Sequence, residues 1–174
     1  MSRPGGNDLL VVHTDGACHG NPGPGGWGAF WKCPRGAVDL VGGLPLTTNN
    51  QMEMMAVWAA LRELTQTHPD VPLKIRTDSQ YVIKGITEWR KGWERRNWRT
   101  ANGDAVKNAD LWRELFALVD VKGKSLSFEW VRGHNGDAGN ERADLLALEG
   151  LQLAKAHRGP GSWARRNGVL AKTA

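Results

Sequence analysis

The chain has too few cysteines for a disulfide framework, since only Cys18 and Cys33 occur among its 174 residues. A chain of this length can bury a sufficient core without covalent cross-links, so we expect it in the reducing cytoplasm. No apolar run approaches the roughly 20 residues that a membrane helix needs. Residues 1–8 are polar and lack the apolar region of a secretory signal. The sequence therefore predicts neither a membrane protein nor a secreted, disulfide-rich domain.

Acidic charge is also in the minority, because 18 Asp and Glu face 23 Lys and Arg, for a formal net charge of +5. A basic balance favours a polyanionic partner without requiring one. The excess is uneven: residues 84–99 hold six cations and only two acids. The same segment contains three tryptophans, Trp89, Trp93 and Trp98. Four others are instead expected in the core: Trp27, Trp58, Trp112 and Trp130.

The hydrophobic pattern predicts one α/β domain over residues 9–156, after a short extension at 1–8. The Gly-, Arg- and Asn-rich segment 157–174 is expected to be a loosely ordered basic tail. Predicted strands lie within 8–16 and at 27–32, 37–46, 73–77 and 126–131, with turn residues throughout 20–28. Predicted helices lie at 51–67, after 78–79, across 89–98, at 110–119 and at 140–156. This order predicts a mixed sheet, in which an antiparallel meander is followed by two strands parallel to the first.

Four acidic residues stand beside apolar segments, where a buried charge needs compensation: Asp15, Glu53, Asp78 and Asp144. Asp15 and Asp78 end strands that the predicted topology makes neighbours, at the edge where α/β sheets gather ligands. No zinc-like set of closely spaced His and Cys exists, so converging carboxylates favour Mg²⁺ or Mn²⁺. Two such ions could activate water and stabilise a leaving oxygen in phosphodiester cleavage.

Each of these acids also has a purely structural interpretation. Asp15 could be a turn residue and Asp78 an N-cap. Glu53 could cap its own helix, and Asp144 could face solvent. Spacing alone favours these interpretations one by one, because the convergence of the four is inferred only from the predicted topology.

Four stretches resemble, in order and at suitable separations, the motifs of the type 1 ribonuclease H family. They read TDGACHGNPGPGGWGAF at 14–30, TTNNQMEMMA at 47–56, TDSQYV at 77–82 and WVRGHNGDAGNERADLLA at 130–147. The resemblance spans residues 9–149 and implies a ribonuclease H-like α/β fold, with a five-stranded mixed sheet flanked by helices. It also implies an endonuclease that hydrolyses the RNA strand of RNA–DNA hybrids and leaves 5′-phosphate and 3′-hydroxyl ends.

The resemblance assigns roles to the acids. It implies a metal-binding catalytic set that holds two Mg²⁺ ions with substrate bound, or Mn²⁺ instead: Asp15, Glu53, Asp78 and Asp144. Asp15 would bridge the two ions. His134 matches the family's mobile-loop histidine, and imidazole can exchange protons near neutral pH. Without the resemblance, His134 would be interpreted as an ordinary loop histidine. A monomer is the family expectation, with no organic cofactor, no membrane partner and no separate hybrid-binding domain before Leu9.

The resemblance further implies contacts to both strands of the hybrid. The RNA-strand residues, placed to detect the 2′-hydroxyl in the minor groove, are Cys18, Asn21, Asn49, Asn50 and Gln80. The DNA strand would meet Thr48 and a basic protrusion, residues 87–103. Its contacts would be Trp89, Trp93, Arg95, Arg96, Trp98 and Arg99. Cys18 could equally be a small packed thiol, and the tryptophans could pack on sugars or hold the protrusion to the core. Gly92 stands where some relatives carry a polar residue, which leaves the individual contacts open.

Three rival functions lack support in the motifs. A transposase or integrase core would rely on fewer acids and would lack TTNNQMEMMA. A non-enzymatic hybrid-binding module would have lost at least one acid, and a basic architectural protein would leave the acids unexplained. The GNPGPGG turn at 20–26 lacks the GK[ST] ending of a nucleotide-binding P-loop. We therefore expect a hairpin turn there, or a close approach to nucleic acid.

Overall fold

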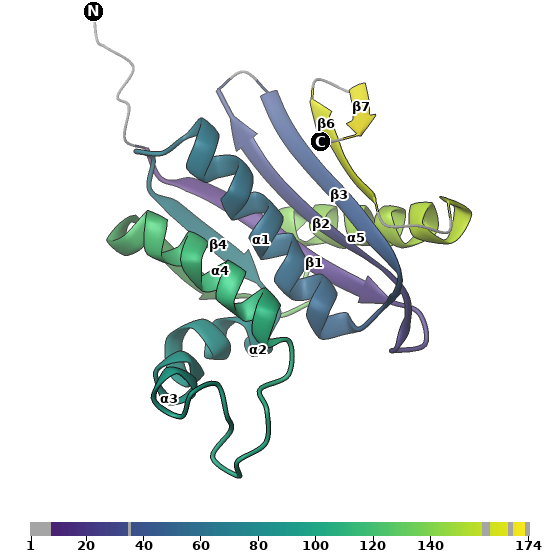
Figure 1. Ribbon diagram of the computed structural model, residues 1–174. Coiled ribbons are helices and arrows are strands. Elements are labelled where there is room, and N and C mark those ends of the chain that lie inside the picture. Colours follow the sequence, from purple (N-terminus) through teal and green to yellow (C-terminus); the bar gives the residue numbers. More distant parts are fainter. Residues whose placement is uncertain (1–7, 35, 158–160, 167–168, 173–174) are drawn as a thin grey trace, which may run out of the picture.

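The computed structural model describes residues 8–34, 36–157, 161–166 and 169–172. It contains one mixed sheet with the strand order β5-β4-β1-β2-β3-β6-β7 (Figure 1). The strands are β1 Leu10–Cys18, β2 Gly23–Cys33, β3 Gly36–Thr47, β4 Leu73–Thr77, β5 Leu126–Trp130, β6 Gly161–Arg166 and β7 Val169–Lys172. The helices are α1 Asn49–Thr67, α2 Gln80–Lys84, α3 Arg90–Arg95, α4 Ala109–Lys122 and α5 Ala138–His157. Two short turns, the π-helical η1 Gly85–Trp89 and the 3-10 η2 Gly123–Ser125, complete the described elements.

The predicted five-stranded mixed sheet is confirmed as the contiguous strands β5-β4-β1-β2-β3. β1, β2 and β3 pair antiparallel, whereas β4 pairs parallel to β1 and β5 parallel to β4. The expected turn over 20–28 is too long, because β2 already begins at Gly23. The glycines there serve packing: a Cβ at Gly26 would collide with the backbone of Ala147 and Leu151 on α5. Glycine at this point therefore lets the helix lie directly on the strand.

Two further strands lengthen the sheet beyond β3. β6 pairs antiparallel with β3, from Val38↔Arg166 to Gly43↔Gly161, and β7 pairs antiparallel with β6. The expectation of a loosely ordered segment from 157 is therefore wrong for 161–166 and 169–172. A strand that joins a sheet edge is held by backbone hydrogen bonds. Because backbone groups are the same at every residue, such a strand need not show a hydrophobic run in the sequence. The rest of that segment, 158–160, 167–168 and 173–174, lies outside the described residues.

Helices cover both faces of the sheet. α1 lies across one face with α4 beside it, and α5 crosses the opposite face behind β1, β2 and β3 (Figure 1). Trp27 and Trp112 are buried as predicted, and Trp58 packs half-buried against the core. The prediction for Trp130 is wrong: it is 47% exposed, because it ends β5, the edge strand. Among the described residues, no helix combines the length and apolar character needed to cross a membrane.

The predicted helix across 89–98 ends early. α3 stops at Arg95, and both Asn97 and Trp98 adopt positive φ angles of 52° and 62°. Such left-handed conformations are incompatible with a continuing α-helix. The chain turns back here, and Trp98 N donates to Trp93 O at 2.7 Å.

Candidate functional site

Three of the four predicted acids converge where α1 meets β1 and β4. Asp15, Glu53 and Asp78 each offer a carboxylate oxygen, and these oxygens lie within 4.8 Å of one another. We call these three residues the carboxylate cluster. The parallel pairing of β1 with β4 brings Thr14 opposite Thr77, and so places Asp15 beside Asp78. Gly16 permits the close approach of α1, because a Cβ there would lie 2.6 Å from Glu53 N.

The carboxylate cluster is electrostatically unfavourable without a cation. Burial, reinforced by the charge of Asp78, raises the pKa of Asp15 from 3.8 to about 7. Burial followed by the charge of Asp15 raises the pKa of Glu53 well above its ordinary value. Burial likewise raises the pKa of Asp78, although nearby His134 opposes this shift. Oε2 of Glu53 is buried without a hydrogen-bond partner among the described residues. A divalent cation would relieve both the repulsion and the unpartnered oxygen.

Asp144 borders the carboxylate cluster rather than completing it. It lies half-buried on α5, and the three-residue group of mutually close oxygens does not include it. Its charge nevertheless raises the pKa of both Asp15 and Asp78, so it faces the same space.

His134 stands on the loop between β5 and α5. Its side chain is exposed, its φ angle is 57°, and its charge acts on Asp78. The preceding residue closes one side of the cluster, because a Cβ at Gly133 would lie 2.6 Å from Oδ2 of Asp78. Trp130, whose exposed position the sequence did not indicate, donates from Nε1 to Asp78 O at 3.1 Å. The loop therefore lies directly against the Asp78 end of the site.

The predicted RNA-strand residues occupy the turn after β1 and the starts of α1 and α2. Asn21 Oδ1 accepts a hydrogen bond from Asn49 N at 2.9 Å, which ties the turn to the start of α1. The Cys18 thiol is half-buried and donates to Thr47 O at 3.4 Å, in agreement with a packed thiol. Asn50 and Gln80 are exposed.

Thr48 begins a polar network that extends beyond its own helix. It is the N-cap of α1, where Thr48 Oγ1 accepts from Gln51 N and Gln51 Oε1 accepts from Thr48 N. Gln51 Nε2 donates to Asn108 Oδ1 at 3.0 Å, and Asn108 Nδ2 donates to Tyr81 OH at 3.1 Å. The T-x-x-Q spacing signals the capping box, but the partner 57 residues away has no local signal.

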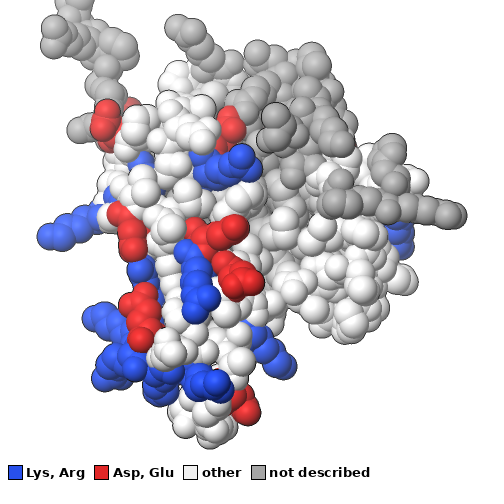
Figure 2. Space-filling view, in the orientation of Figure 1, with Lys and Arg blue, Asp and Glu red and all other residues white. Residues whose placement is uncertain are grey.

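The tryptophans of the basic protrusion mainly hold it to the core. The ring centroid of Trp93 lies 5.8 Å from that of Trp89, 6.1 Å from Trp98 and 5.4 Å from Trp112 on α4. Trp93 and Trp98 are half-buried in this cluster of tilted rings, and Trp89 is 36% exposed. Figure 2 shows Lys and Arg side chains gathered at the lower end of the molecule, where α3 lies in Figure 1. The exposed cations of this segment include Lys91, Arg95, Arg96 and Arg99.

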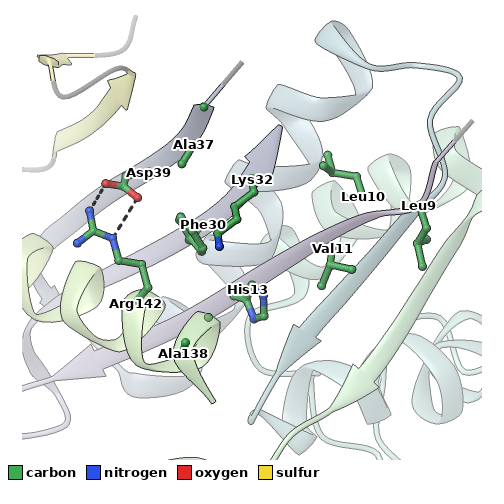
Figure 3. Close-up of a pocket in the computed structure, with 12 residues that line it drawn as sticks. Leu9, Leu10, Val11, His13, Phe30, Lys32, Ala37, Asp39, Ala138 and Arg142 are labelled. Atoms are coloured by element: carbon green, nitrogen blue, oxygen red, sulfur yellow. Dashed lines mark hydrogen bonds and ion pairs between the residues drawn. The ribbon is translucent and has the colours of Figure 1, made fainter. Parts of the chain in front are cut away.

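The described surface contains two pockets near the protrusion and the sheet. One of about 660 Å³ lies on the protrusion, and its lining includes Trp89, Trp93 and Arg95. A larger one of about 830 Å³ lies between the outer face of β1–β3 and the start of α5, and its lining includes His13. Figure 3 shows Arg142 paired with Asp39 at its rim. None of the four predicted acids lines the larger pocket, so size alone does not mark the site.

A mixed α/β sheet with carboxylates gathered at one end and a cationic protrusion beside it is the arrangement expected of metal-dependent hydrolases of nucleic acids. Comparison with known proteins gives the family. The RNase H family model matches residues 7–152. The chain is 52% identical over 151 residues to a ribonuclease H of Albidiferax ferrireducens, a match that covers 87% of this chain and 99% of the relative. The chain belongs to the ribonuclease H family, as its motifs predicted.

Solved structures agree with this assignment. LC9-RNase H1, a type 1 RNase H, is 29% identical with a TM-score of 0.71, over 99% of this chain and 80% of that one. LC11-RNase H1, solved in complex with an RNA/DNA hybrid, is 21% identical with a TM-score of 0.63. That match covers 84% of this chain and 99% of that one, and at this identity it shows the fold alone.

Proposed function

We propose that this ribonuclease H hydrolyses the RNA strand of RNA–DNA hybrids with two Mg²⁺ ions held by its acids. The convergence of Asp15, Glu53 and Asp78 within 4.8 Å is the observation that carries the proposal. Family membership supports the reaction, and a solved relative of the same fold, LC11-RNase H1, was captured with an RNA/DNA hybrid. The expected products are a 5′-phosphate and a 3′-hydroxyl.

The donors fit a hard divalent cation. The carboxylate cluster offers oxygen atoms alone, the ligand type that Mg²⁺ and Mn²⁺ prefer. When bound, the cations would supply an activated water and stabilise the leaving oxygen. Asp15 and Glu53 would release protons as they bind metal, because their pKa values are raised in the metal-free site. Asp144 would complete the site from α5, and exposed His134 would exchange protons at its mouth.

The substrate would lie across the exposed edge formed by the turn after β1 and the start of α1. The proposed RNA-strand contacts are Cys18, Asn21, Asn49, Asn50 and Gln80. The proposed DNA-strand contacts are Thr48, Trp89, Trp93, Arg95, Arg96, Trp98 and Arg99. Exposed Arg95, Arg96 and Arg99 suit phosphate neutralisation. Half-buried Trp93 and Trp98 would act mainly by supporting that surface.

We also propose that the protein acts as a monomer in the cytoplasm. Cys18 and Cys33 are both free, which suits a reducing compartment. Sedimentation of the purified chain at micromolar concentration tests the monomer, and a dimer would contradict it.

The direct test of function is cleavage of labelled hybrid, duplex DNA and duplex RNA, with and without Mg²⁺. The hybrid alone should be cut, in its RNA strand, and only with the metal. Asp15→Asn removes a charge from the buried cluster and should lower the rate by roughly 10³-fold or more. Asp110→Asn, a fully exposed acid on α4, is the matched control and should retain the parental rate. Near-parental cleavage by Asp15→Asn would refute the metal assignment.

A further inference from the structure

The loop that carries His134, residues 131–137, is fastened at its start to the end of β4. Val131 N donates to Thr77 O at 3.0 Å, which continues the β4–β5 pairing by one residue. Trp130 Nε1 donates to Asp78 O at 3.1 Å. Both anchors come from the residues that lead into the carboxylate cluster. The start of the His134 loop is therefore held by the same strand end that positions Asp78.

The end of the loop is fastened to the same strand by a different interaction. Asp137 Oδ1 accepts from Asn140 N at 2.9 Å and so begins α5. Its other oxygen, Oδ2, accepts from Arg76 Nη1 at 2.7 Å. Arg76 Nε also lies 3.4 Å from Glu129 Oε2 on β5. The side chains of Arg76 and Asp137 are only 24% and 28% exposed, so water screens their pairing less than it screens a surface ion pair.

The first turn of α5 rests on β1 at the same place. A Cβ at Gly139 would collide with the imidazole ring of His13, so the helix start lies directly over that ring. Figure 3 shows His13 on β1 beside Ala138, the first residue of α5. Nδ1 of His13 lies 3.8 Å from Asp137 Oδ1. Asp137 therefore lies at the end of the loop, caps the start of α5 and binds Arg76 on β4.

We propose that the ion pair between Arg76 and Asp137 is a positioning device for the cleavage step. It holds the far end of the His134 loop against β4, while Thr77 and Asp78 hold the near end. Because both ends of the loop are attached, His134 stays close to Asp78. Neither Arg76 nor Asp137 touches the reacting atoms in this scheme. The inference rests on the proposed function, because it assigns a role to His134 in that reaction.

Asp137→Asn separates the two interactions of this side chain. An asparagine oxygen still accepts the hydrogen bond that caps α5, but the charge that binds Arg76 is lost. The matched control is Glu129→Gln, which removes a carboxylate from the same guanidinium but lies on β5, outside the loop. Asp137→Asn should lower kcat on hybrid about tenfold with KM nearly unchanged, since small misplacements cost this much. Glu129→Gln should keep parental kcat. Arg76→Met removes the pair from the strand side and should reproduce the effect of Asp137→Asn.

A second comparison tests whether the effect passes through His134. In a His134→Ala background, Asp137→Asn should lower kcat no further, because the loop no longer presents the imidazole. Amide hydrogen exchange over 132–136 should speed up in Asp137→Asn and stay parental in Glu129→Gln. Equal behaviour of these two variants would overturn the inference, as would a tenfold loss that persists without His134. If the parent cut no hybrid, the proposed function would fail, and the exchange comparison would still decide whether Asp137 holds the loop.

Discussion

The carboxylate cluster and the basic protrusion are both rich in ionisable side chains, but those of the cluster are mostly buried and those of the protrusion are mostly exposed. Asp15 and Glu53 are buried, their pKa values are raised chiefly by that burial, and Glu53 has an oxygen with no hydrogen-bond partner among the described residues. By contrast, Lys91, Arg95, Arg96 and Arg99 of the protrusion are exposed, beside tryptophans whose rings pack against one another. A small hard cation needs donors fixed close together, which destabilises the metal-free protein. A polymer of phosphates needs only accessible charge, which costs the fold little.

The largest expected effect concerns the stability of the metal-free cluster. The pKa of Asp15 is raised from 3.8 to about 7, so the folded state favours the protonated carboxyl. The resulting stability is full below pH 3.8 and is lost as the pH rises through about 7. At pH 8 with a chelator, Asp15→Asn should therefore be more stable than the parent, by on the order of 2 kcal/mol. Urea unfolding at pH 4 and pH 8 measures this difference.

Two controls sharpen that experiment. Asp110→Asn, on an exposed acid in the first turn of α4, should change the free energy of unfolding by less than about 1 kcal/mol at both pH values. Added Mg²⁺ should stabilise the parent at pH 8 and leave Asp15→Asn nearly unaffected, since ligand binding stabilises only the state that binds. A parent as stable as Asp15→Asn in chelator at pH 8 would show that the buried charge of Asp15 does not destabilise the metal-free protein.

The protrusion should give the opposite result, a change in binding without a change in stability. Replacing Arg95, Arg96 and Arg99 together by glutamine should weaken hybrid binding roughly tenfold at low salt. The plot of log affinity against log salt concentration has a negative slope, and this slope should become shallower by about 2. That change is smaller than the one expected for the loss of three phosphate contacts. Arg99 Nη1 already donates to Gly103 O at 2.9 Å, which reduces its availability. Binding measured in Ca²⁺ or chelator at several salt concentrations tests this without cleavage.

A charge-matched variant separates the effect of the protrusion on binding from the effect of the protein's net charge. Arg62, Lys124 and Lys155 are exposed and lie outside the protrusion. Their joint replacement by glutamine removes the same charge and should change affinity less than threefold if the effect is local. If the two triple variants lost affinity for the hybrid equally, the protrusion would have no specific role in binding.

The sequence predicts features that local chemistry determines and misses those that depend on distant partners. β4 was predicted residue for residue, because prolines precede it and Asp78 follows it. The motifs single out the four acids and His134 as candidates, and three of the acids converge in the structure, whereas the pairing of β6 with β3 has no local signature. Arg76 and Asp137 are 61 residues apart, so their contact follows only from the folded β4–loop–α5 arrangement.

The smallest expected effect concerns the link between the two regions. The chain of hydrogen bonds from Gln51 through Asn108 reaches Tyr81, whose ring centroid lies 5.7 Å from that of Trp89 in the protrusion. Gln51→Leu breaks the chain and leaves Asn108 partly unsatisfied, so the free energy of unfolding should fall by about 1 kcal/mol. Gln66→Leu, at an exposed position on the same helix, should change it by less than about 0.5 kcal/mol.

The coupling between Gln51 and Asn108 decides whether this link is a network or two separate contacts. Once Asn108→Ala has removed the shared partner, Gln51→Leu should cost markedly less, with a coupling energy of at least about 0.5 kcal/mol. Denaturant unfolding of the parent, both single variants and the double variant measures that energy. Additive losses would mean that the start of α1 and the base of the protrusion are held independently. The buried cluster and the exposed protrusion would then have no polar connection through Gln51.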